Sequence, residues 1–198
     1  MKYKNIECVD GGDNGRAPIA ATACRKLLEE SRVRGVDVYS SGTMVNFTLK
    51  ATDAQLARAV SPFLQVALET GALTPDQITQ IREGREVKQL VLPIIRRLTD
   101  DETERAQGIL FSLGLTRYCR YAGHPKQTIP NRGADGLIFA IGNENYRRVN
   151  GIYQATQEKP QIELLGDFKD PFFSSFAAHK QIAEEIIAAT RSSLAKYI

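Results

Sequence analysis

The feature that most constrains the fold is a strand, a glycine-rich loop, a helix and a second strand at the start of the chain. Residues 4–9 have strand character, and residues 10–15 read Asp-Gly-Gly-Asp-Asn-Gly. A helix follows from Arg16, with Pro18 in its first turn, and residues 36–43 alternate as a second strand. This order predicts a right-handed crossover in a parallel sheet.

Helices dominate the next part of the chain. The caps and stop signals predict one helix over residues 52–70 and a second from Thr74, kinked or broken at Pro93, followed by a third over residues 100–113. Strand character returns at 136–141 and 162–165, with helices at 143–149 and 177–197. We therefore predict one domain over residues 1–198. It is a three-layer α/β/α fold with a four-stranded parallel sheet and a helical insertion at about residues 45–103.

Composition and charge exclude several classes of protein. The chain has 198 residues and a formal charge of +3, with no long basic run, so we expect no nucleic-acid partner. Its longest apolar run, residues 137–141, is far shorter than the ~20 residues of a membrane span, so we expect no membrane partner. The start of the sequence lacks the apolar stretch of a signal peptide, and the three cysteines lack paired spacing. We expect a cytoplasmic protein with reduced thiols.

The glycine-rich loop is a candidate anion site. A loop between a strand and a helix N-terminus gathers backbone N–H groups, and the helix dipole adds partial positive charge. Arg16 could add a bidentate partner for phosphate oxygens. The candidate loop comprises Gly11, Gly12, Asp13, Asn14, Gly15, Arg16 and Ala17. A tight turn without a ligand is the alternative interpretation.

Several segments together resemble the low-molecular-weight protein tyrosine phosphatases. Residues 9–20 are similar to that family's signature loop, Val-Cys-x-Gly-Asn-x-Cys-Arg-Ser-Pro-x-Ala, and residues 40–43 to its second-strand Ser-Ala-Gly-Thr. Residues 106–115, 134–147 and 164–173 are similar to later segments of the family in the same order. The resemblance implies the family's fold and a phosphate-like anion or phosphorylated ligand.

The loop departs from the family at the positions that carry its chemistry. The resemblance places the nucleophilic cysteine six residues before Arg16, where this chain has Asp10. The serine that supports the thiolate is Ala17, and the second loop cysteine is Gly15. Cys8 lies two residues before Asp10, so we expect it to be a buried structural thiol that points away from the loop. A thiolate and the hydroxyl that stabilises it have been lost together.

Asp10 therefore either fills the anion site or changes its chemistry, because a carboxylate there would repel a phosphate dianion. The resemblance places the family's general acid at Asp170 and its cleft-wall aromatics at Phe172 and Phe173, for which simple packing is an alternative role. We treat Asp10, Arg16 and Asp170 as candidate catalytic residues. The two histidines are isolated, and we expect His179 to be solvated or partly packed. We expect no His or Cys metal site.

Two functions remain open from the sequence. The first is a phosphatase-like anion-binding or regulatory protein without cysteine-based hydrolysis, whose helical insertion contacts a protein partner or a second copy. The second is a phosphoester hydrolase in which Asp10 is the nucleophile or a metal ligand, with Asp170 as the general acid. We expect no cofactor, and a divalent metal only under this second reading. A related arsenate reductase would need further paired cysteines, which Cys8, Cys24 and Cys119 do not supply.

Overall fold

The computed structural model describes residues 1–121, 123–169 and 175–198, and these divide into two compact units. The first unit comprises Met1–Val45 and Glu102–Ile198, and the second comprises Asn46–Asp101. The predicted insertion, at about residues 45–103, overlaps this second unit. Within the described ranges, no helix is both long and apolar enough to cross a membrane.

A four-stranded sheet forms the centre of the first unit. Its strands are β1 (Asn5–Asp10), β2 (Asp37–Gly42), β3 (Gly136–Ile141) and β4 (Gln161–Gly166), in the order β2-β1-β3-β4. All neighbouring pairs are parallel, which confirms the predicted sheet. β3 is apolar throughout and buried on both faces. β1, the other central strand, also buries two carboxylates, of which Glu7 is paired with Arg132 at 3.0 Å.

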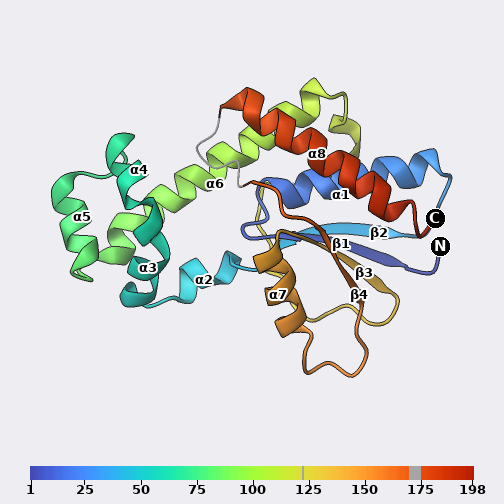
Figure 1. Cartoon of the computed structure of the whole chain (residues 1–198), viewed down its shortest axis with the longest axis horizontal. Helices are drawn as coiled ribbons and strands as arrows, with labels where there is room; N and C mark the ends of the chain where they lie inside the picture. Colours follow the sequence, from blue (N-terminus) through green and yellow to red (C-terminus); the bar gives the residue numbers. More distant parts are fainter. Residues whose placement is uncertain (122, 170–174) are drawn as a thin grey trace. The chain divides into compact units, whose positions relative to one another are not determined.

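Helices cover both faces of this sheet (Figure 1). α1 (Arg16–Glu30) and α8 (Phe176–Leu194) lie on one face, and α7 (Asn143–Ile152) lies on the other. The side chains of β3 alternate between the two layers, as the pleat of a strand requires. Leu137, Phe139 and Ile141 join the core under α1 and α8, whereas Ile138 and Ala140 join the core under α7. This arrangement confirms the three-layer prediction.

The second unit is helical and has its own hydrophobic core. Its elements are α2 (Val45–Lys50), α3 (Asp53–Val60), a 3-10 turn (Ser61–Phe63), α4 (Leu64–Glu69), α5 (Pro75–Arg82) and the first part of α6 (Val87–Ser112). The hydroxyls of Thr52 and Thr74 cap α3 and α5 in complete capping boxes, as their spacing predicts. Leu56, Ile78, Ile81 and Val87 form the centre of the core.

Two helix boundaries differ from the prediction. The helix expected over residues 52–70 divides at Ser61–Phe63, where Pro62 lies in a 3-10 turn. Of the two outcomes predicted at Pro93, a kink or a break, the break does not occur, because α6 runs through Pro93 to Ser112 and includes the helix predicted over residues 100–113. Pro93 and Gln89, whose carbonyl loses its helical partner, are both exposed, so water can satisfy that carbonyl.

Candidate functional site

The glycine-rich loop connects β1 to α1 and rests on the end of β2. The Thr43 amide donates to the Asp10 carbonyl at 2.9 Å, and the Met44 amide donates to the Gly11 carbonyl at 2.9 Å. A Cβ atom on Gly42 would lie 2.7 Å from the Asp13 nitrogen and 2.8 Å from the Gly11 carbonyl oxygen. The loop backbone therefore occupies the space that any side chain at position 42 would need.

Asp10 is the last residue of β1, and its carboxylate binds the loop that follows it. Oδ1 accepts a hydrogen bond from the Asp13 amide at 2.6 Å, and Oδ2 accepts one from the Ala17 amide at 2.8 Å. The side chain is buried, with 2% of its surface exposed. Gly15, the N-cap residue of α1, has no side chain to cap the helix, so Asp10 satisfies a first-turn amide in its place.

Asp13 directs its carboxylate toward a neighbouring segment. It adopts a left-handed backbone conformation, with φ of 53°, and its Oδ2 accepts a hydrogen bond from the Lys126 amide at 2.8 Å. Oδ1 is buried and has no hydrogen-bond donor in the described part of the chain. Burial raises the pKa of Asp13 from 3.8 to about 7, which outweighs the opposite effects of Ser40 and the Lys126 amide.

The remaining predicted residues are only partly described. The Arg16 guanidinium donates through Nη1 to the Phe168 carbonyl at 3.3 Å, which links the start of α1 to the segment after β4. Asn14 is buried beside it in the loop. Asp170, Phe172 and Phe173 lie outside the described residues, so their predicted roles stay predictions.

The structure places a buried carboxylate and a buried histidine beside the loop, and the sequence did not predict either of them. Glu102 of α6 and His179 of α8 are 5% and 1% exposed, and Glu102 Oε1 lies 3.1 Å from His179 Nε2. A Cβ atom on Gly15 would lie 2.4 Å from the same Glu102 oxygen. The prediction that His179 is solvated or partly packed is therefore wrong. Glu102 stands in a charged helical stretch that is typical of a solvated face, so no local signal marks it.

Cys8 is buried as predicted, and it lies beside a second thiol. Its sulfur is 3.9 Å from that of Cys24 on α1, and both side chains are fully buried. The hydrogen bond with Cys24, together with burial, raises the pKa of Cys8 above the ordinary thiol value. Cys8 therefore remains a protonated thiol near neutral pH, in the layer between β1 and α1.

Metal-binding side chains do not gather at the loop in the described ranges. No group of three or more His, Cys, Asp or Glu side chains with metal-binding geometry occurs within them. His124 lies on an exposed part of the segment before Lys126.

Comparison with known proteins identifies the fold. No protein-family model matches the sequence, and no curated protein matches it. Among solved structures, Primo-1 matches with a TM-score of 0.59 at 16% identity, covering 98% of this chain and 99% of that one. The low-molecular-weight phosphotyrosine phosphatase VcLMWPTP-2 from Vibrio cholerae O395 matches with a TM-score of 0.58 at 15% identity, covering 98% and 95%.

A third match was solved with an anion. The tyrosine phosphatase Wzb from Escherichia coli K30, in complex with sulphate, has a TM-score of 0.55 at 14% identity, covering 98% of each chain. The matches agree with the resemblance of the sequence segments. The chain therefore has the fold of the low-molecular-weight protein tyrosine phosphatases.

The contact between Gly42 and the loop predicts a large effect of a single methyl group. Gly42→Ala should lower the free energy of unfolding by more than about 2 kcal/mol, because backbone atoms of the loop must move. Gly151→Ala is the matched control, since nothing lies within 4 Å of its added Cβ and alanine favours the helix by up to about 1 kcal/mol. Urea unfolding of both variants checks this. Equal effects would contradict the packing described.

The buried Asp13 carboxyl predicts a specific pH dependence of stability. Between about pH 4 and pH 7 the folded chain keeps a proton that the unfolded chain has released, so stability falls as the pH rises. Below this window both states are protonated, and above it both are ionised. The parent chain should therefore lose about 4 kcal/mol of unfolding free energy between pH 4 and pH 8 that Asp13→Asn does not lose. Urea unfolding at both pH values measures it, with exposed Asp135→Asn as the control that should lose as much as the parent chain.

Proposed function

We propose that this chain is a phosphatase-like regulatory or binding protein in which Asp10 serves as the built-in anion of the loop. The observation that carries the proposal is the pair of hydrogen bonds from the Asp13 and Ala17 amides to the two carboxylate oxygens. A phosphate group in the loop would need such N–H groups for its own oxygens. The carboxylate therefore competes with phosphate for the same donors.

Charge supports the same reading. A carboxylate about 4 Å from a phosphate dianion would repel it by several kcal/mol at the effective dielectric constant of a partly buried site. Arg16 attracts anions, and its guanidinium also donates to the Phe168 carbonyl at the edge of the loop. We infer that phosphate binds the loop of this chain weakly while Asp10 is ionised.

We propose that this chain does not hydrolyse phosphate esters through a cysteine. Asp10 stands at the position of the family's nucleophile. Cys8 is a buried free thiol in hydrogen-bond contact with Cys24 of α1. Ala17 offers its backbone amide and no hydroxyl to the carboxylate. Asp10 is a poor nucleophile as well, because both of its oxygens accept backbone hydrogen bonds and the side chain is 2% exposed. We propose no cofactor for this site.

Replacing Asp10 tests the proposal. Asp10→Ser should lower the free energy of unfolding by about 1 to 2 kcal/mol, because the start of α1 loses its capping carboxylate. The same variant should gain stability in phosphate, with a melting temperature that rises saturably up to 10 mM, since the amides become available. The parent chain and the exposed control Asp135→Asn should show no such rise.

Activity measurements complete this test. The parent chain should not hydrolyse p-nitrophenyl phosphate above the uncatalysed rate, with EDTA or with Mg²⁺. Turnover by the parent chain that is lost in Asp10→Ser would overturn the proposal and favour a carboxylate-based hydrolase. Equal phosphate stabilisation of the parent chain and of Asp10→Ser would also contradict it.

A further inference from the structure

A large cleft lies in the first unit, on the outer side of β2. It has a volume of about 770 Å³ and runs between α1, the edge strand β2 and the segment that follows α6, which includes the 3-10 turn η2 (Thr116–Tyr118). Asp13 is the only residue that it shares with the candidate anion-binding loop. The other lining residues belong to helix α1, residues 32–40 and residues 117–126. The proposed function makes no use of this cleft.

The side chains that line the cleft carry a formal charge as large as that of the entire chain. Among the described residues, six basic side chains line it, namely Arg25, Arg32, Arg34, Arg117, Arg120 and Lys126, against three acidic ones, Asp13, Glu29 and Asp37. Its formal charge therefore equals the +3 of all 198 residues, so the remainder of the chain is balanced. A small region that carries the whole net charge attracts anions more strongly than the same charge spread over the surface.

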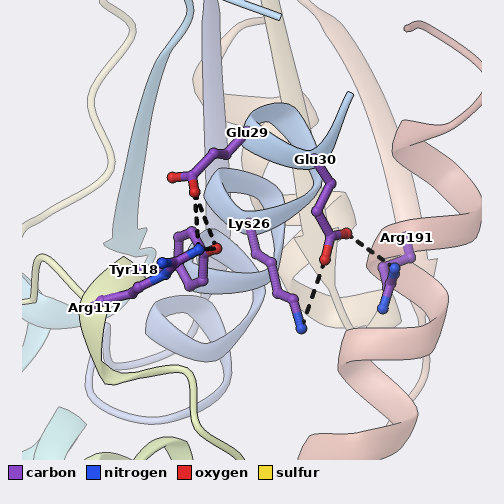
Figure 2. A network of polar contacts seen from close by, with 6 residues as sticks. All are labelled: Lys26, Glu29, Glu30, Arg117, Tyr118 and Arg191. Carbon is purple, nitrogen blue, oxygen red and sulfur yellow. Dashed lines mark hydrogen bonds and ion pairs between the residues drawn. The ribbon is translucent and has the colours of Figure 1, made fainter. Parts of the chain in front are cut away.

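One of the acidic side chains is already neutralised. Glu29 of α1 faces Arg117 and Tyr118 of η2 (Figure 2). The Arg117 Nη2 atom lies 2.9 Å from Glu29 Oε1. The Arg117 guanidinium also stacks over the Tyr118 ring, 4.6 Å from its centroid. This bridge ties α1 to η2 across the cleft. The negative charge of Glu29 is therefore balanced by Arg117.

Two cations outside the cleft share a carboxylate, whereas four cations of the cleft have none among the described residues. Glu30 lies between Lys26 and Arg191 (Figure 2). Its carboxylate oxygens are 3.7 Å from Lys26 Nζ and 3.0 Å from Arg191 Nη2. By contrast, Arg32, Arg34, Arg120 and Lys126 have no carboxylate partner in the part of the chain that the structure describes. All four are exposed at the mouth of the cleft, where their charges can reach a ligand.

A fifth cation forms part of the wall. Arg25 donates to the carbonyls of Val38 at 2.8 Å and Tyr118 at 3.2 Å, which fixes its position between β2 and η2. Burial lowers the pKa of Arg25, and the positive charge of Arg120 lowers it further. The two guanidinium groups therefore repel each other, and an anion between them would relieve that repulsion.

We propose that this cleft binds a small ligand through two or more linked phosphate groups, held by Arg32, Arg120 and the neighbouring cations. Its volume suits a ligand of small-molecule size. Guanidinium groups bind phosphate oxygens in bidentate pairs, and several of them around one cleft match a ligand with several phosphate oxygens.

Two of the tyrosine rings that line the cleft are already covered by arginine side chains, which leaves less aromatic surface for a base. Arg132 covers the Tyr39 ring at 4.4 Å, and Arg117 covers the Tyr118 ring. Asp13 lies at the edge of the cleft. Because its pKa is raised to about 7, its carboxyl is protonated below that pH and repels an anion only weakly. Inorganic pyrophosphate and the diphosphate of a nucleotide share the chemistry that these residues would recognise.

Two double variants test the site. In Arg32→Gly/Arg120→Ala the cleft loses two exposed cations, and glycine relieves the left-handed backbone of Arg32, whose φ is 56°. This variant should therefore stay folded. Arg96→Ala/Arg97→Ala removes the same charge from exposed positions of α6, outside the cleft. Isothermal titration of the full chain with pyrophosphate, ADP and orthophosphate at pH 7 compares them.

We expect pyrophosphate and ADP to bind the parent chain at one site and more tightly than orthophosphate. The cleft variant should bind both at least tenfold more weakly, because charge-assisted hydrogen bonds to phosphate are lost, and the α6 variant should bind as the parent does.

Several results would overturn the proposal. They are no binding of pyrophosphate by the parent chain up to 10 mM, equal weakening in both double variants, or a Kd unchanged by Arg32→Gly/Arg120→Ala. Binding of ADP without binding of pyrophosphate would show that a nucleoside, and not the phosphates, is recognised. Single-stranded DNA that binds more tightly than pyrophosphate would assign the cleft to a nucleic acid instead.

Discussion

The carboxylate of Asp10 joins the end of the central strand to the start of the first helix, and the surrounding loop is arranged around this contact. Its two oxygens accept hydrogen bonds from the Asp13 and Ala17 amides at 2.6 Å and 2.8 Å. Partial positive charge at a helix N-terminus favours a negative group there. In this chain the protein itself supplies that group, so the fold of the loop and its proposed loss of hydrolysis have the same physical origin.

The neighbouring departures from the phosphatase pattern fit this arrangement. Gly15 leaves room for the buried Glu102 carboxylate, whose Oε1 would be 2.4 Å from a Cβ at that position, and Glu102 in turn contacts His179. Ala17 needs to offer only its amide. Gly42 remains a glycine because the loop backbone rests directly on it. By our proposal, a carboxylate, a small residue and a buried acid take the place of a thiolate site.

Local patterns predicted the sheet, the two threonine helix caps and the position of the loop, because each depends on residues that are close in sequence. The path of α6 through Pro93 was not predictable in this way, since the cost of an interior proline depends on whether the orphaned carbonyl meets water. The pairing of Glu102 with His179 depends on two helices far apart in sequence. The same holds for the cleft, where cations from α1, the start of β2 and the segment after α6 meet.

The chain thus offers two places for negative charge with different occupants, an internal carboxylate in the loop and, by our proposal, a linked phosphate in the cleft. A crystal structure of the full chain at saturating phosphate and neutral pH tests the central claim most directly. The account predicts that Asp10 stays on the Asp13 and Ala17 amides, with no phosphate in the loop. A phosphate ion bound to those amides and to Arg16, with the Asp10 side chain turned away, would contradict it.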